Sequence, residues 1–438
     1  MTAGWLAIVS LHIGGNSAYL LPVAAIALVI IGIWVFHAAL LNHGALLGFM
    51  VIMATALCYR VRDEELPGAA DQGLNWQNMV KLAVWGCLMI ICFVNWRPIV
   101  RYLRDPGFMC FLLFLVLSGA STGWSEVPSM TGASVLGLFI YVMFACLLTY
   151  EFPLRTLVTT LIWALAVWCL LNWLSIMVDP STALMDPDIE SAYTRFRGIS
   201  GHPNLIGAQS AIFLCLLVGG YTRDYISRKW FYVLLGIGIV TLVASQSRTS
   251  AFSLVLALTL LRYRRPFFIA ALIGAMLLTI VIVTGQLANL QALFVRGGDG
   301  DVLAGRTDIW EYLDTKVRQR PLLGYGFNSF EANVAQDFNT NPNAQHVEAP
   351  AHPHNNYLEV LFSGGVITLV PYVVWSVLML RRWFINPDFM RDSFYLFLFF
   401  ASFTEVNIPA PAYLGSLVLF ILLANDVRQR DRIPARDQ

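Results

Sequence analysis

Long apolar segments with almost no ionisable side chains follow one another along most of this chain. A membrane-spanning helix needs about 20 mostly apolar residues. Apolar residues make up 58% of the sequence and charged residues 13%, whereas soluble domains carry about 25% charged residues. The sequence therefore predicts an all-α fold, a polytopic transmembrane helical bundle of about 12–14 spans. The candidate spans are 18–40, 44–59, 79–95, 107–120, 133–150, 154–178, 204–221, 230–247, 249–262, 267–286, 358–380, 393–404 and 411–425, with a short or re-entrant piece at 4–15.

Clusters of basic residues predict which loops face the cytoplasm, because cytoplasmic loops are enriched in lysine and arginine. These clusters are Arg97, Arg101 and Arg104; Arg223, Arg228 and Lys229; Arg262, Arg264 and Arg265; Arg381 and Arg382; and Arg428, Arg430, Arg432 and Arg436. Threading the spans between them places 121–132, 179–203, 245–250, 287–357 and 405–410 on the outer side, the periplasm of a bacterium. The predicted organisation is ten spans in 1–286, a large, partly helical outer loop in 287–357, and the last spans with a cytoplasmic tail in 358–438.

The distribution of charge narrows the class of function. A net charge of +1 argues against a nucleic-acid partner. Ion-coupled transporters usually place ionisable residues near the middle of the bilayer and contain paired, interrupted helices. Here the predicted spans are nearly free of such groups, and the polar side chains gather on the outer side. This pattern favours an enzyme that works at the membrane surface over a permease.

Two outer segments contain arginine, which the positive-inside rule disfavours there. The segment YTRFRGISGHPNLIGAQS (193–210) contains Arg195, Arg197, His202 and Asn204. With Gly198 and Gly201, it predicts a flexible cationic loop whose guanidinium groups bind phosphate oxygens. A patch that contacts lipid headgroups is the alternative.

The second such segment is SQSRTS (245–250). There, Arg248 either extends to the membrane interface or binds an anion beside its serine and threonine neighbours.

The large outer loop contains a predicted amphipathic helix after Arg306. Its apolar face is formed by Ile309, Trp310 and Leu313, and Thr307 or Asp308 is the expected cap. Two Asp-X-Asp tripeptides (Asp186 with Asp188, and Asp299 with Asp301) are weak metal signals that turn formation explains. We therefore expect no metal site in this protein.

Two histidines stand just before the span at 358–380, in HPHNNYLEV. His352 precedes a proline and is expected in extended backbone. His354 and Asn355 are expected at the helix entry, with Asn356 as a cap. An imidazole titrates near neutral pH and can accept a proton from an attacking hydroxyl. The alternatives are a histidine at the membrane interface and a zinc site, for which His346 and His202 would also be needed.

These motifs together resemble the O-antigen ligase and exopolysaccharide (O-antigen) polymerase superfamily of bacterial membrane glycosyltransferases. The resemblance covers about residues 100–425 and includes the long outer loop between the tenth and eleventh spans. It rests on RxRGxxGHPNxxG at 195–207, SxSRT at 245–249, GRTDIW at 305–310, PLLGYG at 321–326 and HNxYLE at 354–359.

The resemblance implies a GT-C-like enzyme of the bacterial inner membrane whose active site faces the periplasm. It would move a glycan from undecaprenyl diphosphate to an acceptor hydroxyl, without metal, nucleotide sugar or other cofactor. A polymerase would use a lipid-linked repeat unit as acceptor, and a ligase would use lipid A–core. Membrane lipids, and other polysaccharide-assembly proteins, are the further partners that we expect.

The same resemblance implies roles for individual residues. Arg197 and Arg248 would hold the diphosphate, with Arg195 and Arg306 as secondary candidates. His354, or His352, would deprotonate the acceptor, and direct displacement would invert the anomeric centre. Supporting positions are His202, Asn204, Asn355 and Tyr357. The RGxxGHPN and HNxYLE patterns favour a polymerase, a ligase is the alternative, and a lipid-linked glycan flippase or permease is a remote one.

Overall fold

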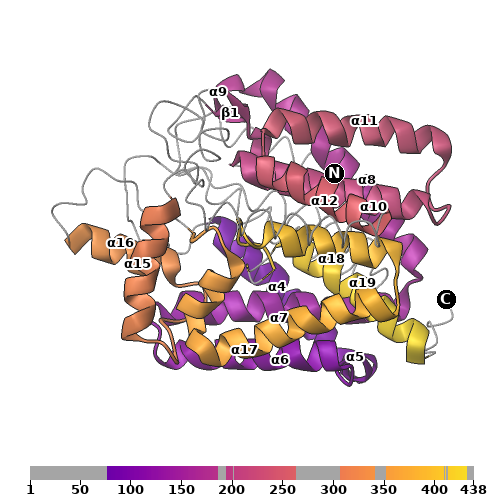
Figure 1. Cartoon of the computed structure of the whole chain (residues 1–438). Helices are drawn as coiled ribbons and strands as arrows, with labels where there is room; N and C mark the ends of the chain where they lie inside the picture. The colour runs from indigo at the N-terminus through magenta and orange to yellow at the C-terminus, as the bar shows by residue number, and fades with distance from the viewer. Residues whose placement is uncertain are drawn as a thin grey trace, which may run out of the picture.

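The described part of the chain is helical apart from one short pair of strands (Figure 1). The computed structural model describes residues 76–185, 194–200, 202–262, 306–340, 352–408, 410 and 413–431. The longer helices are α4 (Trp76–Val94), α6 (Pro106–Ala120), α7 (Pro128–Glu151), α8 (Leu154–Val178), α10 (Pro203–Tyr221), α11 (Arg228–Ser245), α12 (Arg248–Arg262), α15 (Arg306–Gln319), α16 (Phe330–Thr340), α17 (Asn356–Ile385), α18 (Phe389–Ala401) and α19 (Leu414–Asp431). The short elements are α5 (Trp96–Tyr102), α9 (Pro180–Ala183), the 3-10 turns η2 (Ser121–Gly123) and η3 (Gly198–Ser200), and the antiparallel strands β1 (Leu184–Met185) and β2 (Arg195–Phe196). The predicted all-α fold is confirmed.

Six helical segments among the described residues are long and apolar enough to cross a membrane, by length and composition. They are Pro106–Gly123, Pro128–Glu151, Leu154–Val178, Pro203–Tyr221, Arg228–Ser245 and Asn356–Ile385, and shorter apolar stretches occupy Trp85–Val94 and Arg248–Leu261. The chain is therefore a multi-pass membrane protein, as predicted. The predicted spans at 18–40, 44–59 and 267–286, and the piece at 4–15, lie outside the described residues.

Close packing of aromatic rings and glycines joins the helices. The ring centroid of Phe111 (α6) lies 5.0 Å from that of Trp375 (α17) and 4.6 Å from that of Phe420 (α19). A Cβ atom on Gly219 (α10) would lie 2.7 Å from Cγ of Met390 (α18), so only glycine permits this approach. Lipid tails are as apolar as leucine, and helices in a bilayer therefore associate through such van der Waals contacts. Figure 1 shows α18 and α19 between a group containing α8, α10, α11 and α12 and a group containing α6, α7 and α17.

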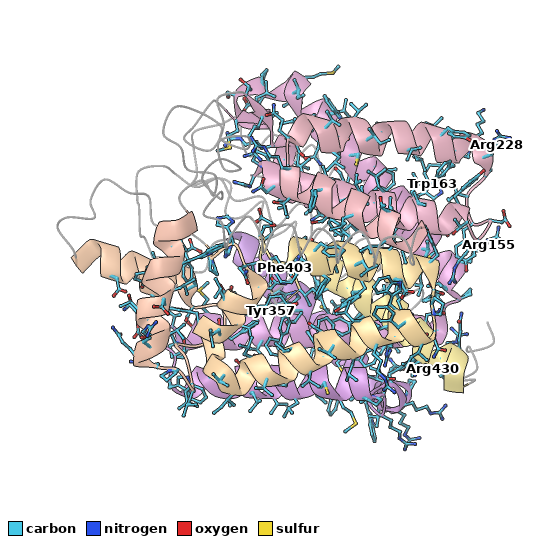
Figure 2. All side chains as sticks on the ribbon, viewed as in Figure 1. Arg155, Trp163, Arg228, Tyr357, Phe403 and Arg430 are labelled. Carbon is cyan, nitrogen blue, oxygen red and sulfur yellow. The ribbon has the colours of Figure 1, made fainter. Side chains whose placement is uncertain are left out.

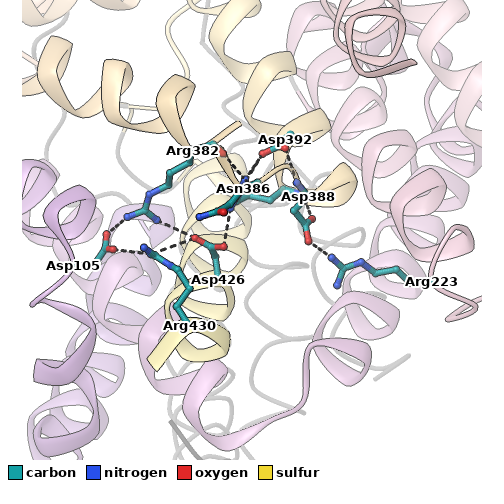
Figure 3. Close-up of polar contacts among 9 residues, drawn as sticks. Asp105, Arg223, Arg382, Asn386, Asp388, Asp392, Asp426 and Arg430 are labelled. Atoms are coloured by element: carbon teal, nitrogen blue, oxygen red, sulfur yellow. Dashed lines mark hydrogen bonds and ion pairs between the residues drawn. The ribbon is translucent and has the colours of Figure 1, made fainter. Parts of the chain in front are cut away.

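Charged residues gather at one end of the bundle. Asp105 accepts hydrogen bonds from Arg382 and from Arg430, the latter at 2.8 Å, and Asp426 lies 3.3 Å from Arg430 (Figure 3). In the same region Arg223 pairs with Asp388, and Figure 2 places Arg155, Arg228 and Arg430 at this end. The loops before α6, after α10 and between α17 and α18 therefore share one end, as the threading between arginine clusters predicted.

The opposite end holds the loops that were predicted to lie outside. The indole Nε1 of Trp124, after α6, donates to the Leu323 carbonyl at 2.9 Å. Helices α15 and α16 lie at this end of the bundle in Figure 1. Leu313 of α15 is buried in a cluster with Tyr325, Phe330, Val334 and Phe362, against which Ile309 and Trp310 pack. The predicted apolar face of the amphipathic helix is therefore confirmed. The helix begins at Arg306, so Thr307 and Asp308 lie within its first turn and neither precedes it as a cap.

Helix α17 is interrupted, although the sequence predicted a continuous span at 358–380. Gly365 has φ 63° and ψ −163°, which lies outside the helical region. Backbone groups freed inside a bilayer need new partners, and a neighbouring loop supplies them. The amides of Tyr325 and Gly326 donate to the carbonyls of Phe362 and Ser363 at 3.0 and 2.8 Å. On the far side of the break, the amides of Val366 and Ile367 donate to the carbonyls of Pro321 and Leu322.

The PLLGYG sequence thus forms a loop that inserts into the broken helix. A Cβ atom on Gly324, whose φ is +62°, would lie 2.4 Å from the Phe362 oxygen. The same loop contacts the turn after α6, where the amide of Phe327 donates to Oγ of Ser121 at 3.0 Å. These contacts fix the base of α15 and α16 beside the first turns of α17, where the predicted histidines lie.

Candidate active site

Arg195 points into the protein from strand β2. Its side chain is only 5% exposed. The Nε atom donates to the carbonyl of Ser245 at 3.3 Å, and a terminal nitrogen donates to Oδ1 of Asn204 at 2.6 Å. The segment that contains Arg195 is therefore joined to both the α11–α12 turn and the start of α10.

Arg197 lies two residues further on, at the edge of the same ribbon. Its guanidinium donates to the carbonyl of Ser181 at 3.2 Å, and its side chain is half-buried. Gly198 follows with φ +51°, and its amide neighbour Ile199 donates to Oδ1 of Asn172 at 2.9 Å. A Cβ atom on Gly198 would meet that Oδ1 atom at 2.2 Å. Gly198 is thus buried in a tight turn, and the flexibility of this loop stays a prediction. Gly201 lies outside the described residues.

Arg248 is exposed as the first residue of α12. The preceding turn is tight: Gln246 has a left-handed φ of 51°, and its Nε2 atom donates to the Thr194 carbonyl at 3.1 Å. A Cβ atom on Gly207 of α10 would lie 2.3 Å from Cβ of Ser247, so the turn rests directly on α10. The N-terminus of a helix carries a partial positive charge that favours anions. Arg248 and the helix end therefore present positive charge together, at the end of the bundle that was predicted to face outward.

His202 caps helix α10. Its Nδ1 atom accepts a hydrogen bond from the amide of Asn204 at 3.1 Å, and its side chain is exposed. The Asn204 side chain lies between Arg195 and the loop after α18, because its Nδ2 atom donates to Oε1 of Glu405 at 3.1 Å. In the GHPN motif, the histidine therefore caps the start of α10, and the asparagine connects Arg195 to Glu405 by hydrogen bonds.

His354 lies at the entry of α17 in a left-handed conformation, with φ 51°. Its Nδ1 atom is 3.4 Å from Oε2 of Glu405, and the two side chains are 21% and 22% exposed. The residue that caps the helix is Asn355, whose Oδ1 atom accepts from the amides of Tyr357 and Leu358 at 2.9 and 3.1 Å. Asn356 was predicted as the cap, and this prediction is wrong by one residue.

Asn356 instead joins α17 to the loop after α18. Its side-chain Nδ2 donates to Oδ1 of Asn407 at 2.6 Å, and the Asn407 amide donates back to its Oδ1 atom at 2.7 Å. The backbone amide of Asn356 also donates to the carbonyl of Ser402 at 2.8 Å. Tyr357 packs on Phe403, with 5.4 Å between ring centroids (Figure 2). The loop that carries Glu405 is thus tied to the helix that follows His354.

Helix α15 holds the histidine segment from the other side. The indole Nε1 of Trp310 donates to the carbonyl of Pro353 at 3.0 Å. His352, before that proline, is exposed. Arg306 begins α15, but its side chain, like Asp186, Asp188, Asp299, Asp301 and His346, lies outside the part that the structure describes.

Glu405 is the residue that sequence reasoning missed. A usable signal was present, because Glu405 is the only charged residue between Asp392 and Asp426. An isolated ionisable residue among apolar segments marks a functional position more often than chance. With Glu405 included, a continuous hydrogen-bonded chain runs Arg195–Asn204–Glu405–His354. An imidazole beside a carboxylate can accept a proton from a hydroxyl, and the neighbouring arginine-bearing loops can bind an anion.

The chain is similar in sequence to known proteins. Residues 231–373, which include Arg248, Arg306 and His354, match the O-antigen ligase family. The chain is 23% identical over 365 residues to the exopolysaccharide production protein ExoQ of Rhizobium meliloti. The match covers 77% of this chain and 81% of that protein. It is 36% identical over 73 residues to a candidate polysaccharide ligase of Rickettsia felis, covering 16% of this chain and 18% of that protein. The resemblance to the O-antigen ligase and polysaccharide polymerase superfamily is confirmed.

Proposed function

We propose that this protein is a glycosyltransferase of the bacterial inner membrane that moves a glycan from undecaprenyl diphosphate to an acceptor hydroxyl on the periplasmic face. The observation that carries the proposal is the pair formed by His354 and Glu405, joined through Asn204 to the loops that contain the arginines. An imidazole held by a carboxylate next to positive charge suits a transfer that removes a proton from one substrate and expels an anion from the other.

His354 is the proposed general base. An ionised carboxylate can only accept hydrogen bonds, so the Nδ1 atom that faces Glu405 carries the proton and Nε2 keeps its lone pair. Nε2 takes the proton of the acceptor hydroxyl as its oxygen attacks the anomeric carbon. The bond from that carbon to the phosphate oxygen breaks, and its electron pair leaves with undecaprenyl diphosphate. Attack opposite the leaving group inverts the anomeric centre.

Arg197 and Arg248 are the proposed diphosphate ligands, with Arg306 as a further one. Negative charge grows on the leaving phosphate during the transfer, and fixed guanidinium groups at a water-poor interface stabilise it strongly. Arg248 is supported by its exposure at the start of α12, where the helix end adds positive potential. In this proposal, arginines perform the charge stabilisation that a metal supplies in other transferases.

The acceptor is proposed to be a second lipid-linked glycan, which makes the protein a polysaccharide polymerase. The relative matched over most of both chains is named for exopolysaccharide production, and this supports a polymerase. The alternative is a ligase that transfers the glycan to lipid A–core. It is supported by the O-antigen ligase family match and by the relatives named as ligases.

The material that accumulates when the gene is deleted tests this proposal. Loss of a polymerase leaves single repeat units on undecaprenyl diphosphate in the outer leaflet. Loss of a ligase leaves polymerised glycan on undecaprenyl diphosphate and bare lipid A–core. Repeat units retained in the cytoplasmic leaflet would instead identify a flippase and contradict the proposed transferase. The purified protein should extend lipid-linked repeat units extracted from the deletion strain, and a His354→Ala variant should not.

A further inference from the structure

We propose that Arg195 and Asn204 form a positioning relay for His354, in which Arg195 orients the Asn204 amide, Asn204 orients Glu405, and Glu405 orients the imidazole. This proposal rests on the proposed function, because the group that is positioned is the base of that reaction. It removes Arg195 from the diphosphate ligands and gives it a role within the protein.

The position of Arg195 supports an internal role. The side chain is 5% exposed, and its Nε atom and one terminal nitrogen donate to protein oxygens on α11 and α10. A diphosphate ligand needs its guanidinium donors directed to the substrate. Arg248, which is exposed at a helix end, meets that requirement better.

The Asn204 amide can face its neighbours in only one way. Arginine only donates hydrogen bonds, and an ionised carboxylate only accepts them. Oδ1 of Asn204 must therefore face Arg195, at 2.6 Å, and Nδ2 must face Glu405, at 3.1 Å. Arg195 thus determines the direction in which the amide donates.

Each carboxylate oxygen of Glu405 faces one member of the relay. Oε1 accepts from Asn204, and Oε2 faces Nδ1 of His354 at 3.4 Å. A rotation of the carboxylate would weaken both contacts at once. Asn204 also stands between Arg195 and Glu405, so without its side chain the two charges could pair directly and draw the carboxylate away from the imidazole.

The relay joins two separately built parts of the site. Glu405 and His354 are held together by the contacts of Asn356 with Ser402 and Asn407. Asn204 and Arg195 belong to the other part, since they are attached to α10 and to the turn before Arg248. The orientation of the base therefore depends on the loops proposed to bind the donor.

A split between kcat and KM distinguishes this relay from direct substrate binding. Asn204→Ala and Arg195→Gln should both lower kcat about 10-fold, the cost of a lost hydrogen bond to a charged group. The donor KM should change less than about two-fold, because a positioning residue makes no ground-state contact with substrate.

A double-mutant cycle tests whether Asn204 acts through Glu405. In a Glu405→Gln background, Asn204→Ala should cause no further loss, because residues that act as a unit are not additive. Arg195→Lys, which keeps a donor, should retain more activity than Arg195→Gln. Arg318→Ala is the matched control, because Arg318 is exposed on α15, and it should leave kcat and the donor KM unchanged. Thermal unfolding in detergent confirms that each variant is folded.

The outcomes separate the two proposals. Independent losses in the cycle, or a raised donor KM in Asn204→Ala, would overturn the relay while His354→Ala remains inactive. Full activity in His354→Ala would overturn the proposed function itself. Undecaprenyl-diphosphate-linked repeat units serve as the probe in all of these assays.

Discussion

Nδ1 of His354 lies 3.4 Å from Oε2 of Glu405, although 51 positions separate the two residues in the chain. The histidine precedes α17 and the glutamate follows α18, so the pair exists only when these helices pack together. A carboxylate behind an imidazole fixes its tautomer and stabilises its protonated form, which is the arrangement that general-base catalysis uses.

Removing Glu405 should therefore weaken catalysis more than substrate binding. We expect Glu405→Gln to lower kcat about 10²-fold, and His354→Ala to lower it at least as much, since a positioned base contributes about 10²–10⁴-fold. Transfer of radiolabelled glycan between lipid-linked repeat units measures the effect. Asp314→Asn is a matched control, because Asp314 is exposed on α15 and pairs with Arg318 one helical turn away. Equal losses in Glu405→Gln and Asp314→Asn would exclude a specific role for Glu405.

The arginine at the start of α12 should be needed for donor use. Arg248→Ala should abolish transfer while expression and thermal stability stay normal, because the residue is exposed and its loss leaves the core unchanged. Arg248→Lys should restore little activity, since lysine lacks the planar fork that binds two phosphate oxygens. Arg318→Ala, which removes an arginine that is 77% exposed on α15, should behave like the wild type. Wild-type turnover by Arg248→Ala would exclude the proposed clamp.

Features of local composition were predictable from the sequence. The apolar segments predicted the helices. The arginine clusters predicted that Arg223, Arg382 and Arg430 lie at one end of the bundle, where their ion pairs are found. The same threading placed Arg248 and His354 away from this end. Each of these depends on the properties of neighbouring residues, which a single sequence displays directly.

Features that depend on contacts between distant segments were not predictable. Arg195 was expected to face a ligand, but the carbonyl of Ser245 and the amide of Asn204 draw it inward. The break in α17 at Gly365 is stable only because residues 321–326 supply hydrogen bonds to it. Apolar periodicity continues through this break, and the sequence therefore resembled an uninterrupted helix.

The insertion of the PLLGYG loop into α17 should make its glycines essential for folding. A Cβ atom on Gly365 would lie 2.2 Å from the backbone of Leu322, in addition to the cost of a left-handed φ of about 1–2 kcal/mol. Gly365→Ala and Gly324→Ala should therefore lower the Tm in detergent, or the yield of folded protein. Gly236→Ala is the control, because no atom lies within 4 Å of the added methyl group. Unchanged Tm values for both loop variants would show that this interruption does not support the fold.

The ion pairs of Asp105 should make the stability of the protein depend on pH. Burial acts to raise the pKa of the Asp105 carboxyl, but Arg382 and Arg430 outweigh it and hold that pKa below its usual range. A lowered pKa in the folded state contributes stability above the unfolded-state value near 3.8, and this contribution is lost as the pH falls further. Asp105→Asn removes the charge and keeps the helix cap, because asparagine can also accept hydrogen bonds from the amides of Gly107 and Phe108.

At neutral pH this substitution should cost about 2–4 kcal/mol, since it removes the more buried of the two carboxylates that these arginines contact and leaves them only Asp426 of that pair. Over the range from about pH 6 to about pH 2.5, the difference in Tm between the wild type and Asp105→Asn should stay steady down to about pH 4. It should shrink only as the pH falls below the unfolded-state value near 3.8 towards the lower pKa of the folded carboxyl. Thermal unfolding in detergent across this range measures the difference. Equal Tm values for the two proteins at every pH would mean that Asp105 supports α6 through its cap alone, and that its ion pairs add nothing measurable.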